Sequence, residues 1–259
     1  MKNNIVYSEL ELDFDENIFV DEFDKYILSN TVPHVRVHAI WNDMAKLNKY
    51  WNIISDEEYN RYDKIIASGN KEASLDGMTH YWTATNLMAK KFSTPSNHLT
   101  GSGWRANMLS TSTVVKDEYK NLQIIDWIFN KIPHERIIGI HCTVTPPGVF
   151  VAMHRDVLWK REGDNPSSNN GFFNKGYKVI CLNISNGGVP LLWSLDHEKE
   201  SPRIADTKCY MISDYFLHGL TRTTSIRRQL RVSFKPSKDF FKYIKQDTAI
   251  SLPSNYVYQ

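Results

Sequence analysis

The chain has almost no excess of charge of either sign. Its 259 residues include 31 Lys and Arg against 29 Asp and Glu, which leaves a formal net charge of +2. Surfaces that bind nucleic acid usually carry a clear basic excess, so charge gives no support for a nucleic-acid partner. Hydrophobic residues make up 41% of the chain and aromatic residues 12%, which is ample for a core and argues against disorder.

Long apolar runs are missing as well. No segment approaches the roughly 18 consecutive apolar residues of a membrane-spanning helix. Residues 1–19 lack the basic start and apolar run of a signal peptide. We therefore expect a soluble, cytoplasmic protein without membrane contact. The sequence makes no prediction about oligomeric state.

Cysteine is scarce and has no metal-site spacing. The three cysteines, Cys142, Cys181 and Cys209, form no CxxC pair, and each lies in an apolar stretch. This pattern is typical of small buried side chains and not of a zinc knot or a disulfide framework. We expect buried free thiols in a reducing environment.

Neither repeats nor a linker rich in Pro, Gly and Ser divides the chain, so we expect a single domain over residues 1–259. Its character changes near residue 135. Residues 1–135 look mainly helical and would supply support and substrate-side elements. Residues 136–236 have the periodicity of strands, and residues 237–259 form a C-terminal extension.

Helical spacing of apolar residues predicts three helices in the first part of the chain. They cover residues 15–30, residues 55–68, where a capping-box arrangement opens the helix, and residues 116–132. Residues 34–41 and 78–88 are ambiguous.

Six runs rich in β-branched and apolar residues predict strands. They cover residues 136–145, 149–154, 177–185, 189–195, 204–213 and 228–234. The second run follows the first almost at once and is predicted as its neighbouring strand. Short strands after a helical first part indicate a β-sandwich or jelly roll braced by N-terminal helices, with an up-and-down barrel as the structural alternative.

The second of these runs, "VFVAMH", stops at His154, and Asp156 lies two positions further on. In a chain with 9 His and 29 Asp plus Glu such a pair can arise by chance, and a strand-end His bonded to a loop carboxylate is the ordinary interpretation. Residues i and i+2 of a strand point to the same side, so both side chains could also reach one metal ion. His218, just after a distant apolar run, would be the third ligand. Two imidazoles and one carboxylate leave open metal positions, as in non-haem Fe(II) oxygenases.

A basic cluster, "SIRRQLRVSF", follows later in the chain. In a strand, Arg231 and Ser233 would share one face while the apolar residues between and beside them share the other. Packing of the apolar face outward would turn Arg231 into the interior, where an unpaired charge costs several kcal/mol. A bound acid is the partner this predicts, gripped by the guanidinium with a further hydrogen bond from Ser233.

In this order, His154-x-Asp156, His218 and Arg231-x-Ser233 resemble the Fe(II)/2-oxoglutarate-dependent dioxygenase superfamily, whose fold is the double-stranded β-helix or jelly roll. The similarity covers about residues 136–236. Within the superfamily, "HRD", "GYKVICLNIS" and "YMISDYFLHGLTR" look most like the branch of aspartyl/asparaginyl β-hydroxylases and free amino-acid hydroxylases.

The resemblance implies that His154, Asp156 and His218 hold Fe(II). It also implies that 2-oxoglutarate chelates the iron through its keto-acid end and meets Arg231 and Ser233 through its distal carboxylate. O2 would be consumed, succinate and CO2 released, and an unactivated C–H bond of a small acid, an amino acid or an amino-acid residue hydroxylated. The presence of Asp156 favours hydroxylation or desaturation over halogenation, because halogenating relatives lack this carboxylate.

Further residues are candidates for cosubstrate binding. Arg228 has a spacing from His218 that is also seen in the family, and it is the alternative to Arg231. Tyr177 and Asn183 share one face of the strand predicted over 177–185; they line the cavity or are ordinary core and edge polar groups.

Trp159 and Arg105 are candidates for substrate contact. Trp159 follows the "HRD" motif in a loop, and Arg105 lies in the Gly-rich segment "SGWRANM". Two other functions remain open at this stage: a metal-dependent cupin enzyme that does not use 2-oxoglutarate, and a non-enzymatic jelly roll in which His154 and His218 are core residues.

Overall fold

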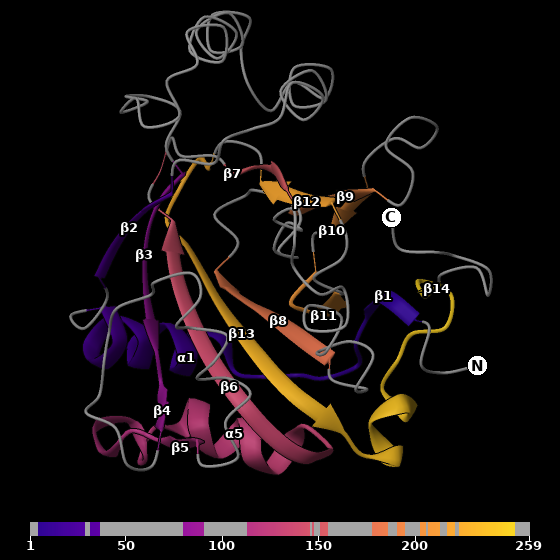
Figure 1. The fold of residues 1–259 in the computed structure, drawn as a ribbon, viewed down its shortest axis with the longest axis horizontal. Helices are drawn as coiled ribbons and strands as arrows, with labels where there is room; N and C mark the ends of the chain where they lie inside the picture. Colours follow the sequence, from indigo (N-terminus) through magenta and orange to yellow (C-terminus); the bar gives the residue numbers. More distant parts are fainter. Residues whose placement is uncertain are drawn as a thin grey trace, which may run out of the picture.

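The described part of the protein consists of two antiparallel sheets and a separate two-stranded ribbon, with helices against the larger sheet (Figure 1). The computed structural model describes residues 5–28, 32–36, 80–90, 113–145, 147, 151–154, 178–185, 191–194, 203–205, 207–212, 217–220 and 223–251. No helix in these ranges is long and apolar enough to cross a membrane.

The larger sheet has eight strands in the order β14-β1-β11-β8-β13-β6-β3-β2. In chain order they are β1 (Ile5–Glu9), β2 (Val32–Arg36), β3 (His80–Asn86), β6 (His134–Thr145), β8 (Lys178–Ser185), β11 (Cys209–Ile212), β13 (Arg227–Pro236) and β14 (Ile250–Ser251). Neighbouring strands pair antiparallel throughout. The strands predicted over 136–145, 177–185 and 228–234 are confirmed as β6, β8 and β13.

The smaller sheet has four strands in the order β10-β9-β12-β7. They are β7 (Val151–His154), β9 (Leu191–Ser194), β10 (Arg203–Ala205) and β12 (Leu217–Leu220). A separate two-stranded ribbon is formed by β4 (Met88–Lys90) and β5 (Thr113–Val115).

The chain passes repeatedly between the two sheets. From β6 it crosses to β7 in the smaller sheet, returns to β8, crosses to β9 and β10, returns to β11, crosses to β12 and returns to β13. The result is two facing layers, β11-β8-β13-β6 and β10-β9-β12-β7, which is the strand order of a double-stranded β-helix or jelly roll. The predicted fold is confirmed. An up-and-down barrel is excluded, because most consecutive core strands lie in different sheets.

Two strand predictions are wrong in detail. The run predicted over 149–154 is described from Val151 to His154, and this strand, β7, pairs with β12 in the other sheet and not with β6. Turn residues between two strands indicate that the chain changes direction, but they do not fix which sheet it joins. The run over 204–213 is two strands in different sheets, because Thr207 and Lys208 form a bend between β10 and β11.

The helix predicted over residues 15–30 is confirmed. Helix α1 covers Glu16–Glu22 and continues as a π-helical turn over Phe23–Ile27. Asp15 caps its start, because its carboxylate accepts hydrogen bonds from the backbone N–H groups of Asn17 and Ile18 at 3.0 and 3.2 Å.

The helix predicted over residues 116–132 is confirmed only in its second half. A 3-10 turn covers Asp117–Tyr119, and helix α5 covers Gln123–Lys131. The extended backbone of Leu122, with φ −74° and ψ 140°, separates them. The helix predicted over 55–68 lies outside the described residues.

The first and third of the predicted helices are joined by a carboxylate. Both oxygens of Glu22, on α1, accept hydrogen bonds at the start of α5, from the backbone N–H groups of Gln123 at 2.6 Å and Ile124 at 2.8 Å. A helix begins with N–H groups that have no partner within the helix, and its dipole favours a negative charge there. Glu22 therefore caps α5 across the interface between the two helices.

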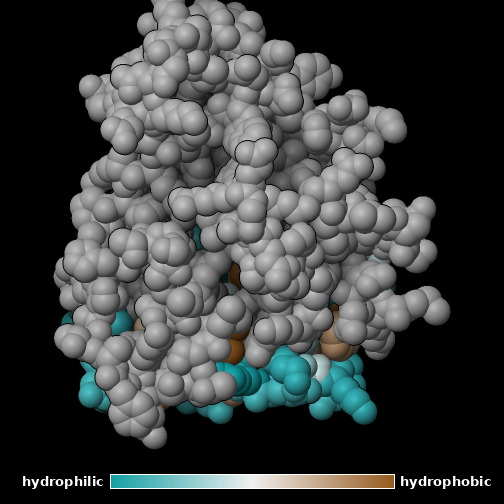
Figure 2. Space-filling view, viewed as in Figure 1, coloured by the Kyte–Doolittle hydropathy of each residue, from teal (hydrophilic) through white to brown (hydrophobic). Residues whose placement is uncertain are grey.

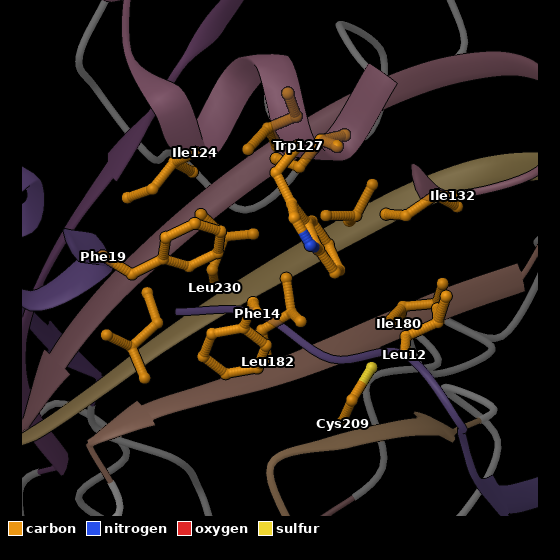
Figure 3. Close-up of a cluster of buried hydrophobic side chains, with 14 of the residues drawn as sticks. Leu12, Phe14, Phe19, Ile124, Trp127, Ile132, Ile180, Leu182, Cys209 and Leu230 are labelled. Atoms are coloured by element: carbon orange, nitrogen blue, oxygen red, sulfur yellow. The ribbon is translucent and has the colours of Figure 1, made fainter. Parts of the chain in front are cut away.

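Aromatic side chains of the helical layer pack on one face of the larger sheet (Figure 3). The rings of Phe14 and Phe19 stack with centroids 4.9 Å apart, and Trp127 lies edge-on to them at 5.9 and 5.7 Å. Leu182 of β8 and Leu230 of β13 belong to the same buried cluster. We call this side of the larger sheet the helical face.

The segments that the sequence leaves ambiguous contribute strands. Residues 78–88 contain β3 and the start of β4, and residues 34–41 begin within β2. The C-terminal extension continues the larger sheet, because β14 pairs with β1. On the side drawn in Figure 2, the described surface at the base of the molecule, around α5 and Lys238–Lys242, is mainly hydrophilic.

All three cysteines are free and buried, as expected. Burial raises the pKa of the Cys142 and Cys209 thiols well above the usual range. Both groups are therefore neutral, inert parts of the core.

Candidate functional site

Strand β13 separates apolar and polar side chains by alternation. Leu230, Val232 and Phe234 belong to the buried apolar cluster on the helical face. Arg231 and Ser233 therefore project from the opposite face, as the sequence predicts, and so do Arg227 and Gln229 by the same parity.

The strands beside β13 continue this polar surface. In register, Arg231 lies opposite Cys181 of β8 and His141 of β6. Further along β8, Asn183 lies opposite Gln229, and Cys181 in turn lies opposite Tyr210 of β11. We call this surface the polar face; its members are His141, Cys181, Asn183, Tyr210, Arg227, Gln229, Arg231 and Ser233.

Arg227 is the most unusual member of the polar face. It is only 2% exposed, and the hydrogen bonds of its side chain in the described part of the protein go to neutral groups: Nη2 donates to Asn183 Oδ1 at 2.8 Å, and a side-chain hydrogen bond with Tyr210 raises its pKa. Its Nε is buried and has no hydrogen-bond partner among the described residues. Among the side chains described, no carboxylate pairs with it. Burial lowers the pKa of this guanidinium below its usual value, but an arginine stays charged at neutral pH, so Arg227 is a buried cation without a counter-ion there.

Neutral side chains hold Arg227 in place. Oδ1 of Asn183 also accepts a hydrogen bond from Gln229 Nε2 at 3.2 Å, and Gln229 Nε2 lies 2.8 Å from the hydroxyl of Tyr210. Asn183 Nδ2 donates to the backbone carbonyl of Thr207 at 2.8 Å. Burial raises the pKa of Tyr210 well above its usual value, so this hydroxyl is neutral as well.

Arg228 contrasts with its neighbour. It projects from the helical side of β13, where Asp24 accepts two hydrogen bonds, from Nε at 2.7 Å and from Nη2 at 2.6 Å. Its Nη1 donates to Ser185 Oγ at 3.1 Å. A bidentate carboxylate pair satisfies a guanidinium well, so Arg228 already has its anion and lies away from the polar face.

The backbone brings two of the predicted metal ligands together. In the smaller sheet β7 pairs with β12, and the register sets His154 directly opposite His218. The same register places Trp193 of β9 on the other side of His218. For both histidines the structure describes the backbone. Asp156, Tyr177, Trp159 and Arg105 lie outside the described residues.

The connections of the jelly roll tie the smaller sheet to one end of the polar face (Figure 1). Five residues, 146–150, lead from β6 to β7, and six residues, 221–226, lead from β12 to β13. The ends that they join on the larger sheet are neighbours, because Thr145 pairs with Arg227. Arg227 thus begins the strand that follows the His218 strand.

Sequence reasoning missed Arg227. The signal was present, since Arg227 is four positions from Arg231 and an even spacing puts both on one strand face. What the sequence does not reveal is that Arg227 is the more deeply buried of the two and that one of its nitrogens lacks a partner.

No family model and no curated protein matches the chain. Among solved structures, it is similar to a prolyl-4-hydroxylase from Pseudomonas putida, with 13% identity over 86% of this chain and 100% of that one, and a TM-score of 0.32. It is also similar to SnoN, a non-haem alpha-ketoglutarate-dependent epimerase of nogalamycin biosynthesis (9% identity, 96% and 88% covered, TM-score 0.40). A third is iron-bound HygX from Streptomyces hygroscopicus (8% identity, 88% of each chain covered, TM-score 0.32). The jelly-roll assignment rests on the strand order of this chain.

Proposed function

We propose that the protein is an Fe(II)- and 2-oxoglutarate-dependent oxygenase that hydroxylates an unactivated C–H bond. One combination of features carries the proposal: a cross-strand pair of histidines in the smaller sheet, together with a buried, uncompensated arginine on the polar face of the larger sheet. A keto dicarboxylate needs two open positions on a metal for its keto-acid end. It also needs a cation for its distal carboxylate.

The metal would be held by His154, His218 and Asp156. Directly opposite residues of an antiparallel pair project from the same face of a sheet, so the two imidazoles are expected on one side of β7 and β12. Asp156 follows His154 by two positions and supplies the carboxylate. This donor set suits Fe(II). When bound, iron and 2-oxoglutarate supply the O2-dependent oxidation, with release of succinate and CO2.

The distal carboxylate of 2-oxoglutarate would bind the polar face. Arg227 is the principal candidate, because its buried Nε lacks a partner and a guanidinium in that state is stabilised by an anion. Arg231 and Ser233, on the same face, are proposed to flank the carboxylate. Arg228 is not part of this site, since Asp24 occupies its guanidinium.

The substrate class rests on the sequence resemblance. A small acid, an amino acid or an amino-acid residue is proposed, with Trp159 and Arg105 as candidate substrate contacts and Tyr177 as a further cosubstrate contact. Succinate release, measured over a panel of amino acids, small acids and short peptides, identifies the substrate by the compound that raises it above the uncoupled background.

The test of the proposed function is an anaerobic titration with Fe(II) and 2-oxoglutarate. The wild-type protein is expected to give a weak visible charge-transfer band, and His154→Ala and Asp156→Ala are expected to abolish it. His134→Gln and Asp21→Ala are matched controls that retain the band, because neither residue belongs to the proposed ligand set.

Each rival function has its own outcome. A wild-type protein that binds neither Fe(II) nor 2-oxoglutarate is a non-enzymatic jelly roll, and the proposal fails. Fe(II) binding with a 2-oxoglutarate affinity that neither Arg227→Met nor Arg231→Met changes indicates a metal-dependent cupin enzyme of another type.

A further inference from the structure

We propose that Asn183 is a positioning residue that orients Arg227 toward an anionic ligand while leaving its charge uncompensated. The inference rests on the anion site of the proposed function and deepens it. In this inference Asn183 orients Arg227 and does not contact the cosubstrate directly. The ligand then supplies the negative charge that compensates Arg227.

The hydrogen bonds of Asn183 fix its orientation. A guanidinium only donates hydrogen bonds, so the Asn183 atom 2.8 Å from Arg227 Nη2 is the carbonyl oxygen Oδ1. The amide nitrogen then faces the Thr207 carbonyl, to which it donates at 2.8 Å. Asn183 is 2% exposed. Its carboxamide is therefore a rigid link between the backbone at Thr207 and the Arg227 side chain.

The choice of an amide at this position determines the charge of the site. Asn183 and Arg227 are both buried, and a carboxylate of the same shape would form an ion pair there. One position along the same strand, Arg228 does have such a partner in Asp24. Two adjacent arginines are thus treated differently: a carboxylate neutralises one, and an amide only orients the other.

Among the described side chains around Arg227, no carboxylate supplies the missing charge. Gln229 reaches Asn183 and Tyr210 but is itself neutral. Burial is the largest effect and lowers the pKa of the Arg227 guanidinium, Tyr210 and Cys181 raise it, and Arg231, which has the same sign, lowers it by a smaller amount. A ligand carboxylate at the free Nε would remove this repulsion and satisfy the unpartnered donor.

Two substitutions of Asn183 distinguish its effect on the orientation of Arg227 from the effect of a negative charge at position 183. Asn183→Asp keeps the size of the side chain and adds a charge that competes with the ligand for Arg227. Asn183→Ala removes the link and adds no charge. We expect Asn183→Asp to weaken dicarboxylate binding by about 30-fold or more, a loss typical of changing one partner of a buried, hydrogen-bonded charge. Asn183→Ala should also weaken binding, but its effect should be several-fold smaller than that of Asn183→Asp. A purely structural role gives the opposite order, because Asp preserves the packing better than Ala.

The probes are glutarate with the metal-free protein and 2-oxoglutarate with Fe(II) under anaerobic conditions, both measured by calorimetry. Asn17→Asp, on the exposed start of α1, is the control for net charge and is expected to bind like the wild type. Where Asn183→Asp does not fold, Gln229→Glu replaces it, because it also places a negative charge on the polar face beside Asn183 and Arg227; a loss of dicarboxylate affinity is expected again.

The outcomes separate this inference from the proposed function. Glutarate affinity that falls in the order wild type, Asn183→Ala, Asn183→Asp supports the inference even if no Fe(II) band is found. Fe(II)-dependent succinate release with equal affinities for wild type and Asn183→Asp leaves the oxygenase intact and overturns the inference. A wild-type protein that binds neither dicarboxylate also overturns it.

Discussion

At the scale of single residues, the strongest expectation concerns the three arginines of β13. Arg227→Met is expected to weaken 2-oxoglutarate binding by about 100-fold, because it removes the charged group whose buried Nε has no other partner. Arg231→Met is expected to weaken it by about tenfold or less.

Without ligand, Arg227→Met should be as stable as the wild type or more so, since it removes a buried charge that has no counter-ion among the described side chains. Calorimetry with Fe(II) present gives the affinities, and thermal unfolding gives the stability.

Arg228→Met is the matched control for these two variants. It lies on the same strand but on the helical side, paired with Asp24, so 2-oxoglutarate affinity should stay within about twofold of the wild type. Its cost is in stability, about 1–3 kcal/mol for loss of hydrogen bonds to a charged group. If Arg231→Met causes the greater loss of affinity, Arg231 and not Arg227 is the principal residue.

For these arginines, the sequence predicts which face of the strand each occupies but not which partner it has. Alternation along a strand correctly separated Arg231 and Ser233 from the apolar residues of β13, because that pattern depends only on local geometry. Partners far apart in the sequence decide the rest. Arg228 meets Asp24, and Arg227 meets Asn183. No spacing rule connects such pairs, so the sequence did not distinguish the compensated arginine from the uncompensated one.

At the scale of elements, the contact between α1 and α5 depends on one carboxylate. Glu22→Ala removes the acceptor for the first two N–H groups of α5 and should lower the free energy of unfolding by about 1–2 kcal/mol, the usual range for loss of a helix cap. Glu22→Gln keeps an acceptor but loses the charge and should cost less. Urea unfolding measures both. Glu11→Ala, at an exposed residue, is the control and should change little; an equal effect of Glu11→Ala and Glu22→Ala would contradict the capping role.

The elements differ in how well the sequence predicts them. Strands β6, β8 and β13 and helix α1 follow from local composition and spacing, and all four were found. The sheet that a strand joins depends on contacts between distant segments, so β7 was predicted beside β6 and lies beside β12. Short strands such as β12, with four residues, carry too few positions to show a period. The predicted neighbourhood of His154 and His218 came from the order of motifs, and the register of β7 and β12 agrees with it at the backbone.

At the scale of the whole molecule, the pH dependence of stability should carry a contribution from Lys178. This residue is 4% exposed, and burial lowers its pKa from 10.5 to about 8. In the unfolded chain the amine keeps its ordinary pKa, so between pH 8 and 10.5 the unfolded state binds more protons than the folded state. Stability therefore rises with pH across this window, by up to about 3 kcal/mol. Below pH 8 the full cost of burying the charge remains.

Lys178→Met isolates this contribution. The difference in unfolding free energy between wild type and variant should move in favour of the wild type as pH rises from 8 to 10.5, and it should be constant below pH 7. Cys142 and Cys209 titrate in the opposite sense, because their raised pKa values make stability fall at high pH, but they are present in both proteins and cancel in the difference. Urea unfolding at half-unit steps of pH measures it. If the unfolding free energies of the two proteins change in parallel with pH, the Lys178 ammonium keeps its ordinary pKa in the folded state. Burial in β8 would then not destabilise the charged form.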